Sequence, residues 1–528
     1  MRDFQFPGRS PLRVTEAAAA TSHPLASAAA LDVLRAGGNA IDATIAAAAV
    51  LAVVEPQSTG IGGDGFMLYA PKGGGKVIAY NGSGRAPQKA TLDWYRAQGF
   101  DSVPTYGVHA VTIPGIVDTW CRVHADHGSR PLETLLAPAI RYAEEGYIVG
   151  DRVAFDWALC AERFAAIPDV DPVLFPGGRV PRAGEKMRDP RLAETLRRIA
   201  RHGRDGFYTG PVAEDIVGHL KSLGGVHEMG DFAAAAGEYV EPISTGYRGV
   251  DVFQMPPNNQ GVTALLMLNI LGGFDLGQLD PVGAERLHLE IEAGRLAYRD
   301  RDALIADPKQ AKVPVKALLA RDYADRLRGL IRRDRALTSL PPPLLQNSDT
   351  VYLCVVDRDR NAVSMINSTY HSFGSGVVAP KSGVILQNRG SSFRLDPAHP
   401  NCIAPGKRPM HTIMPGMAVK DGKALMPFGV MGGAYQPFGH VHLLTNILDY
   451  GMDPQAALDC ARVFIDSGQV EVERSVPAAA WRGLEERGHK VVEAVEPHGG
   501  GQAIMIDPES GTLTAGSDPR KDGCALGY

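Results

Sequence analysis

An abrupt change of pattern around Thr350 is the feature that most constrains how this chain can fold. Residues 335–349 show neither helical nor strand periodicity, and Pro341-Pro342-Pro343 forbids a helix there. Val351–Val356 is then continuously apolar and rich in β-branched residues, which is typical of a buried strand. Pattern alone therefore makes Thr350 a residue at which a loop enters a strand.

Composition and charge exclude several classes of partner. The 528 residues are 45% apolar and 21% charged, which is typical of a globular protein. The net charge is −5, and both signs are scattered, so we expect neither nucleic-acid nor membrane-surface binding. By length the chain could hold about three or four domains, although large α/β folds often form one unit.

The remaining bulk features favour a reduced cytoplasmic protein. The longest apolar run, Ala43–Val54, is too short for a membrane span, and residues 1–9 lack the apolar region of a secretory signal. The six cysteines lie far apart without C-x-x-C spacing, so neither a disulfide framework nor a zinc knuckle is predicted.

Periodicity predicts helices on both sides of a strand-rich centre. The expected helices are Leu25–Arg35, Ala40–Val54, Leu132–Glu145, Leu192–His202, Val212–Leu223, Gly261–Leu271, Ala284–Asp300, Gly439–Leu448, Pro454–Ala461 and Ala478–Arg487, and residues 132–302 are expected to be mainly helical. The expected strands are Phe66–Ala70, Val77–Tyr80, Val351–Val356, Ala362–Asn367, Gly383–Gln387, Gly416–Val419, Ala424–Gly429 and Gln502–Asp507. This distribution indicates layered α/β architecture.

Three glycine-rich stretches are candidate cofactor or anion sites. Gly60–Gly65 follows a helix and precedes a strand, the reverse of a dinucleotide fingerprint, and Val77 follows Gly73-Gly74-Gly75-Lys76 where a phosphate loop needs Ser or Thr. We therefore expect no cofactor and a hairpin turn at residues 73–76. Val430–Gly433 lies between a strand and a helix, so it is either an ordinary turn or an anion-binding nest.

Other catalytic and metal-binding patterns are missing from the sequence. The histidines show no H-E-x-x-H spacing, so no metal is predicted. Asp357–Asn361 begins like a calcium loop but lacks its glycine and its bidentate glutamate, and a turn between two strands fits better. No G-x-S-x-G elbow occurs, and Gly374-Ser375-Gly376 is expected to be a turn.

A series of short motifs, taken together, is more specific than any of these patterns. They are Ala26–Asp42, Val54–Pro56, Gly60–Gly63, Pro114–Gly115, Met255–Pro257, Ile291–Ala293, Asp300–Asp302, Asp349–Thr350, Phe373–Gly376, Lys407–Pro409 and Gly432–Gly433. In this combination the chain resembles, over nearly its whole length, the γ-glutamyltranspeptidase family of N-terminal nucleophile hydrolases.

The resemblance implies a four-layer αββα sandwich and a self-cleaving precursor. Cleavage between Asp349 and Thr350 by an N-to-O acyl shift would give a large subunit of residues 1–349 and a small subunit of residues 350–528. Thr350 is then the nucleophile, and its freed amine, whose ordinary pKa is about 7.7–8.0, serves as the base. By the same resemblance Ser368 orients the nucleophile, and the backbone N–H groups of Gly432 and Gly433 hold the oxyanion.

Departures from the family pattern bear on the substrate. The candidate substrate-binding residues are Tyr370, Arg389, Ser392, His411 and Thr412, which match family substrate-binding positions, and Arg85, which lies near one. Ser392 replaces the aspartate that holds a γ-glutamyl ammonium, whereas Arg389 replaces a glutamine. Ser83 replaces the arginine that holds the α-carboxylate, with Arg85 two residues on. Charge complementarity then favours a small acyl group with a carboxylate and no amine, and the pattern resembles the oxamate amidohydrolase branch.

Two alternatives stay open at this point. A γ-glutamyltransferase or glutathione hydrolase would use Arg85 in place of the missing arginine. An uncleaved nucleotide-binding protein would use the glycine loops instead. Apart from a small-molecule amide and the two subunits of one precursor, no partner is predicted, and the sequence leaves a higher oligomer open.

Overall fold

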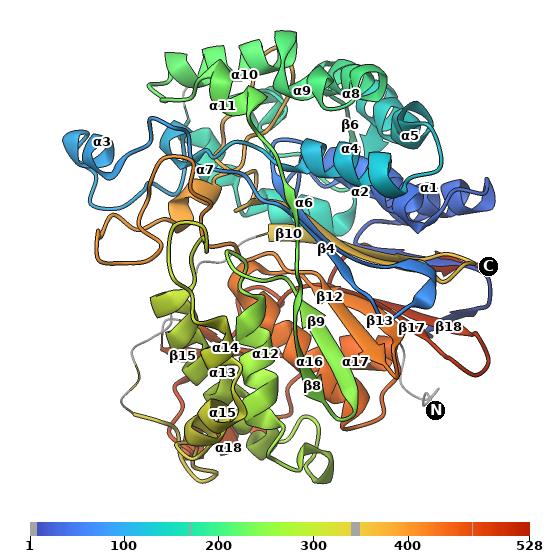
Figure 1. Cartoon of the computed structure of the whole chain (residues 1–528), viewed down its shortest axis with the longest axis vertical. Helices are drawn as coiled ribbons and strands as arrows, with labels where there is room; N and C mark the ends of the chain where they lie inside the picture. Colours follow the sequence, from blue (N-terminus) through green and yellow to red (C-terminus); the bar gives the residue numbers. More distant parts are fainter. Residues whose placement is uncertain (1–7, 168–169, 339, 341–348, 467) are drawn as a thin grey trace.

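Two seven-stranded sheets form the centre of the protein. The computed structural model describes residues 8–167, 170–338, 340, 349–466 and 468–528, and within these ranges the sheets pack face to face with helices outside them (Figure 1). The predicted α/β class is therefore confirmed. Pro341-Pro342-Pro343 lies outside the described residues. No helix within these ranges is long and apolar enough to cross a membrane.

The first sheet contains the junction residue Thr350. Its order is β19-β2-β10-β11-β3-β4-β7, and all its neighbouring strands are antiparallel. The strands are β2 (Ala18–Thr21), β3 (Asp64–Ala70), β4 (Ile78–Gly82), β7 (Glu238–Val240), β10 (Asp349–Val356), β11 (Ala362–Tyr370) and β19 (Cys524–Gly527). Because β10 is a central strand covered on both faces, its sequence is apolar without alternation.

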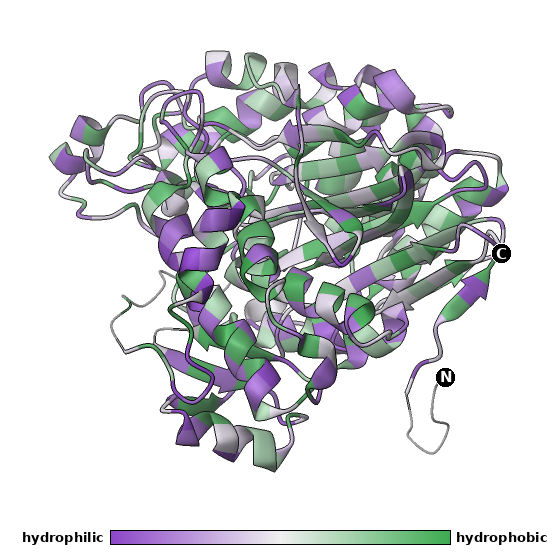
Figure 2. Ribbon diagram, turned by 60° about the horizontal axis from the view of Figure 1, so that its bottom comes forward, coloured by the Kyte–Doolittle hydropathy of each residue, from purple (hydrophilic) through white to green (hydrophobic). Residues whose placement is uncertain are grey.

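The second sheet faces the first across a buried apolar layer. Its order is β1-β18-β17-β13-β12-β9-β8, with strands β1 (Leu12–Val14), β8 (Ile243–Tyr247), β9 (Val250–Gln254), β12 (Gly416–Lys420), β13 (Lys423–Val430), β17 (Gly501–Ile506) and β18 (Leu513–Ser517). Phe66, Tyr352 and Ile366 from the first sheet form one buried cluster with Met417 and Ile504 from the second. Figure 2 shows hydrophobic residues along the strands of this centre.

N-terminal helices cover the outer face of the first sheet (Figure 1). They are α1 (Pro24–Arg35), α2 (Ala40–Val54), α4 (Ile116–His127), α5 (Leu132–Glu145), α6 (Asp151–Ala158), α7 (Ala161–Ala165), α8 (Pro190–His202), α9 (Asp205–Tyr208), α10 (Gly210–Ser222) and α11 (Met229–Ala233), with α3 (Leu92–Ala97) at the periphery. Helix α2 lies against β10 and β11, and all its residues are buried. Its alanines allow this close packing, and Asn39 and Asp42 cap its start reciprocally.

A second group of helices covers the outer face of the second sheet. It comprises α12 (Gly261–Leu271), α13 (Ala284–Leu304), α14 (Val315–Leu318), α15 (Arg321–Arg328), α16 (Gln436–Leu448), α17 (Pro454–Asp459) and α18 (Ala478–Glu486). Two small sheets lie outside the central pair: β14 (Val463–Asp466), β15 (Gln469–Val472) and β16 (Val491–Glu493) in one, and β5 (Tyr147–Ile148) and β6 (Lys186–Met187) in the other.

The predicted helices all form, with ends that differ by a few residues, whereas one expected strand is wrong. The stretch 132–302 is mainly helical as predicted, and it also contains short strands, among them the partly exposed β7, β8 and β9. Gly383–Gln387 is not a strand, because its backbone bonds go to several different segments rather than to one ladder: Leu386 N–H donates to Val377 and Gln387 N–H to Gly62. The expected turns at residues 73–76, 357–361 and 374–376 are confirmed.

Candidate active site

Thr350 lies at an irregularity in the ladder between β10 and β11. The register shifts there, since Asp349 pairs with Tyr370 whereas Val351 pairs with Asn367. Thr350 is buried, with 1% of its surface exposed, and its hydroxyl lies 3.4 Å from Ser368 Oγ. Gln436, the first residue of α16, points its Nε2 at Thr350 Oγ1 from 3.5 Å. These contacts are long, as catalytic hydrogen bonds often are before substrate binds.

Gly432 and Gly433 lie where β13 ends and a 3₁₀ turn, Gly433–Tyr435, leads into α16. Both have positive φ, 105° and 54°, which glycine adopts without steric cost. Neither backbone N–H has an acceptor within the part of the chain that the structure describes. Two neighbouring donors without described acceptors, of which Gly433 is buried and Gly432 partly exposed, can hold a developing oxyanion.

Arg389 is completely buried beside Tyr370 and Thr412. Its guanidinium stacks on the Tyr370 ring, with Cζ 3.7 Å from the centroid, and its Nη1 donates to Thr412 Oγ1 at 2.8 Å. Its Nε and Nη2 have no hydrogen-bond partner among the described residues. Burial lowers the pKa of Arg389 to about 10, which leaves it charged at neutral pH. A buried cation with two unused donors in one plane is suited to a carboxylate.

The backbone of Tyr370 is strained, since its φ of 86° is rare for a bulky residue. This conformation ends β11, and the Tyr370 N–H donates to Ser368 Oγ at 2.8 Å. One residue therefore supports both the hydroxyl beside Thr350 and the guanidinium of Arg389.

Asp64 is a buried carboxylate that joins four separate segments. Its Oδ1 accepts from Gly84 N–H at 2.9 Å, Gly115 N–H at 3.1 Å and Gln387 Nε2 at 2.9 Å. Its Oδ2 accepts from His411 Nε2 at 3.0 Å. Burial raises the pKa of Asp64 to about 6, while its hydrogen bonds and the charge of Arg389 act in the opposite direction.

His411 is neutral in this arrangement. Burial, followed by the nearby charges of Arg389 and Arg408, holds its pKa well below its ordinary value. The contact with Asp64 is therefore an N–H···carboxylate hydrogen bond rather than an ion pair. His411 supports the site through Asp64 and does not offer a positive charge to a substrate.

Gln260 connects the Arg389 side of the site with the glycine pair. Its Nε2 donates to the carbonyl oxygens of Thr412 at 2.6 Å and Gly433 at 2.9 Å, and its Oε1 accepts from Arg301 at 3.0 Å. Because Thr412 Oγ1 also accepts from Arg389 Nη1, Thr412 and Gln260 link the guanidinium to the Gly433 carbonyl. The structure thus brings together Thr350, Ser368, Tyr370, Arg389, His411, Thr412, Gly432 and Gly433.

Arg85 lies in a different environment from Arg389. Its Nη1 donates to the Gly406 carbonyl at 3.1 Å, and its guanidinium pairs with Glu238 at 3.5 Å and Asp307 at 3.7 Å. It would have to leave these carboxylates to hold a substrate. Ser392 is buried in the same 3₁₀ turn as Arg389, and its Oγ has no partner among the described residues.

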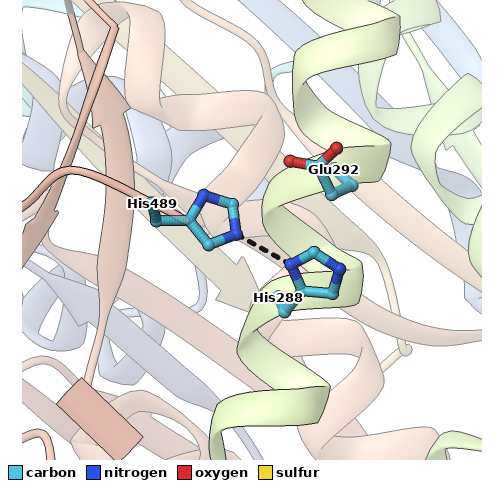
Figure 3. A group of neighbouring side chains, drawn as sticks. All are labelled: His288, Glu292 and His489. Atoms are coloured by element: carbon cyan, nitrogen blue, oxygen red, sulfur yellow. Dashed lines mark hydrogen bonds between the residues drawn. The ribbon is translucent and has the colours of Figure 1, made fainter. Parts of the chain in front are cut away.

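A group of metal-ligating side chains, His288, Glu292 and His489, lies away from these residues (Figure 3). Their ligand atoms lie within 4.8 Å of one another, but each side chain already has hydrogen bonds. His288 Nδ1 is 2.7 Å from His489 Nε2, His288 Nε2 contacts the Arg332 carbonyl at 2.6 Å, and Glu292 accepts from Leu337 N–H at 2.9 Å. These bonds fasten residues 332–337 to α13, so a structural role accounts for the group.

Sequence reasoning missed Asp64, Gln260 and Gln436. Asp64 follows the Gly60–Gly63 loop, and its position between two glycines is the available signal. Nothing in the sequence marks Gln260 or Gln436, because their roles depend on partners more than 40 residues away.

The gamma-glutamyltranspeptidase family profile matches residues 26–528. The chain belongs to the γ-glutamyltranspeptidase family. The family and the hydrolase class predicted from the sequence are thereby confirmed.

Three members of the family illustrate how widely the similarity extends. The chain is 40% identical to a glutathione hydrolase-like YwrD proenzyme of Bacillus subtilis, covering 96% of this chain and 97% of the relative. It is 37% identical to an oxamate amidohydrolase proenzyme of Klebsiella pneumoniae, covering 97% and 99%. The crystal structure of a cephalosporin acylase from Bacillus halodurans superposes with a TM-score of 0.94 at 42% identity, covering 100% and 99%.

Proposed function

We propose that the chain is an autoprocessing N-terminal threonine amidohydrolase for a small amide that carries a carboxylate, with oxamate as the best candidate. The observation that supports this most is Arg389, fully buried with Nε and Nη2 unpartnered among the described residues. A buried polar group without a partner is costly, and a substrate carboxylate would satisfy both donors at once. Ser392, in turn, offers no charge to a substrate ammonium.

Maturation begins with Thr350 as part of the chain. Its Oγ attacks the Asp349 carbonyl carbon, the C–N bond to Thr350 breaks, and the nitrogen takes the hydroxyl proton to become a free amine. Water then hydrolyses the ester, leaving residues 1–349 with a terminal carboxylate and residues 350–528 with an N-terminal threonine. Ser368 and Gln436 are the neighbours that hold the Thr350 hydroxyl for this attack.

Turnover uses the same hydroxyl with its own amine as the base. Thr350 Oγ attacks the amide carbon, and the resulting oxyanion accepts hydrogen bonds from the backbone N–H groups of Gly432 and Gly433. The C–N bond of the substrate breaks, and ammonia leaves with the proton that the amine accepted. Water cleaves the acyl-enzyme and releases oxalate, while the carboxylate of the acyl group stays on Arg389.

The architecture is consistent with this chemistry. We infer the four-layer αββα sandwich of N-terminal nucleophile hydrolases, supported by the two facing sheets and the helix groups outside them. All six cysteines are free thiols, which fits the reducing cytoplasm expected from the sequence.

Denaturing mass spectrometry tests maturation. Wild-type protein should give two fragments that meet at the Asp349–Thr350 bond, and Thr350→Ala should give one intact chain. A single uncleaved chain in the wild type would instead favour the nucleotide-binding alternative.

Ammonia release tests the substrate. Mature enzyme should release ammonia from oxamate and act poorly on a γ-glutamyl anilide. The competing candidate is a glutathione hydrolase or γ-glutamyltransferase, which is favoured by the similarity to the B. subtilis protein. Good turnover of the anilide without ammonia from oxamate would support that candidate and overturn ours.

A further inference from the structure

A large hollow lies beside Gly432, outside the residues that surround Arg389. Its volume is about 670 Å³, and its lining includes Tyr106, Arg163, His371, Gly432, His498 and Lys521. It thus borders one of the two proposed oxyanion donors and the residue after Tyr370. Arg389, Ser392, His411 and Thr412 are not among the described residues that line it.

The position of the hollow assigns it to one half of the substrate. An amide has an acyl half and an amine half on opposite sides of the carbonyl carbon, and the carbonyl oxygen must face Gly432 and Gly433. If the acyl half lies against Arg389, the amine half is directed to the other side of the carbonyl, where the hollow borders Gly432. This assignment rests on the proposed function.

The size of the hollow exceeds what ammonia needs. A water molecule, which is similar in size to ammonia, occupies about 30 Å³ in the liquid. Sites for drug-sized ligands span about 300–1,000 Å³. A volume of about 670 Å³ therefore corresponds to an amine the size of a substituted ring or a short peptide.

Among the arginines and lysines that line the hollow, Arg163 is the one whose charge no described carboxylate neutralises. Arg152 and Lys521 both pair with Asp156, at 2.7 Å and 3.3 Å, so their charges are partly neutralised. Arg163 has no carboxylate partner in the described ranges of the chain, and its buried Nε has no hydrogen-bond partner there. The lining also contains two acids, Glu471 and Glu496, which belong to the C-terminal part of the chain.

Arg163 is also held in a fixed position. Its Nη2 donates to the Ser372 carbonyl at 2.7 Å, and its guanidinium lies 4.3 Å from the Tyr106 ring centroid and 4.9 Å from that of Phe164. Tyr106 is 45% exposed and lies 6.0 Å from the His371 ring. A fixed guanidinium beside the exposed Tyr106 ring can receive a planar group that carries an acid.

We propose that the hollow binds the amine half of the substrate, and that this amine is a ring-sized group bearing a carboxylate, received by Arg163 and Tyr106. The favoured substrate is then an amide with acids on both halves, of which oxamate is only the acyl part. In turnover the C–N bond breaks as described above, and the amine leaves into the hollow with the proton accepted by Thr350.

Two synthetic amides test this proposal on the mature enzyme. N-benzyloxamate and N-(4-carboxybenzyl)oxamate differ in the carboxylate, while the methylene keeps the basicity of the two leaving amines similar. We expect both to be better substrates than oxamate, and the carboxybenzyl amide to exceed the benzyl amide in kcat/KM by about tenfold, mainly through KM. In Arg163→Gln this ratio should fall to about 1, and Arg163→Lys should retain part of it.

Controls separate this proposal from the proposed function. Arg474→Gln removes an exposed arginine that pairs with Glu493 and is not among the described residues that line the hollow, and it should leave the ratio unchanged. Faster turnover of oxamate than of both benzyl amides would overturn the assignment of the hollow, and a ratio that persists in Arg163→Gln would overturn the role of Arg163. The same amines are also tested as γ-glutamyl amides. If only these are cleaved and the ratio still depends on Arg163, the acyl assignment fails and the hollow proposal stands.

Discussion

Replacing Arg389 with glutamine is the sharpest test of how the acyl half is recognised. Glutamine is the residue expected at this position in γ-glutamyl enzymes, and it removes the charge together with the Nε and Nη2 donors that have no partner among the described residues. Hydrogen bonds to charged groups contribute about 1.5–3 kcal/mol. For a carboxylate held by both donors we expect a loss of about 3 kcal/mol, or roughly 100-fold in kcat/KM.

The assay compares oxamate with oxamide, its neutral isostere, by ammonia release from mature enzyme. Arg389→Gln should lose roughly 100-fold on oxamate and change little on oxamide, because the effect comes from the carboxylate. The fold should not suffer, since the variant removes a buried cation with two unpartnered donors. Cleavage into two fragments and an unchanged melting temperature check this.

Arg85→Gln is the matched control for Arg389→Gln. Arg85 already pairs with Glu238 and Asp307, so its loss should leave the oxamate-to-oxamide ratio unchanged. Equal losses on oxamate and oxamide in Arg389→Gln would refute the reasoning. A loss confined to Arg85→Gln would identify Arg85 as the carboxylate anchor.

Three further predictions concern the oxyanion donors, acid stability and the anchor on α13. Gly432→Ala should lower kcat by about 10²–10³-fold, because a side chain is strained at φ 105° and meets Gly499 Cα at 3.1 Å, which tilts the donor; normal turnover by correctly cleaved variant would contradict this. Burial lowers the pKa values of His440 and His489 to about 3 and of His23, His227 and His498 to about 4. These imidazoles stay neutral in the folded state, whereas in the unfolded state they become protonated below about pH 6.5. The free energy of unfolding therefore falls as the pH decreases from 6.5 towards 4, by about 1.4 kcal/mol per pH unit for each histidine. A melting temperature of the Thr350→Ala precursor that is flat from pH 6.5 to 4 would refute this. In the same precursor, Glu292→Ala should cost about 1–3 kcal/mol because it leaves the Leu337 N–H without its acceptor, whereas Glu485→Ala at an exposed position should cost little.

The sequence by itself determined the local structure and supplied the proposal of Thr350 as the reactive residue. The bounds of α2 follow from Asn39 at its start and Glu55-Pro56 at its end, and the turn at Asp357–Asn361 follows from short-range bonds to Asp357. These features depend on neighbours within a few residues, which a linear pattern records. Thr350 was found through a combination of motifs.

Only the tertiary structure decided which side chains support the proposed site and which of its donors lack partners among the described residues. Asp64 accepts from Gly84, Gly115, Gln387 and His411, up to 347 residues away, and no local pattern encodes such a partner set. Whether Arg389 is paired could not be read from its neighbours, because burial and partner geometry arise only when distant segments pack. The hollow at Gly432 has the same origin, since its walls include Tyr106, residues of α6 and α7, and several segments between His371 and Lys521.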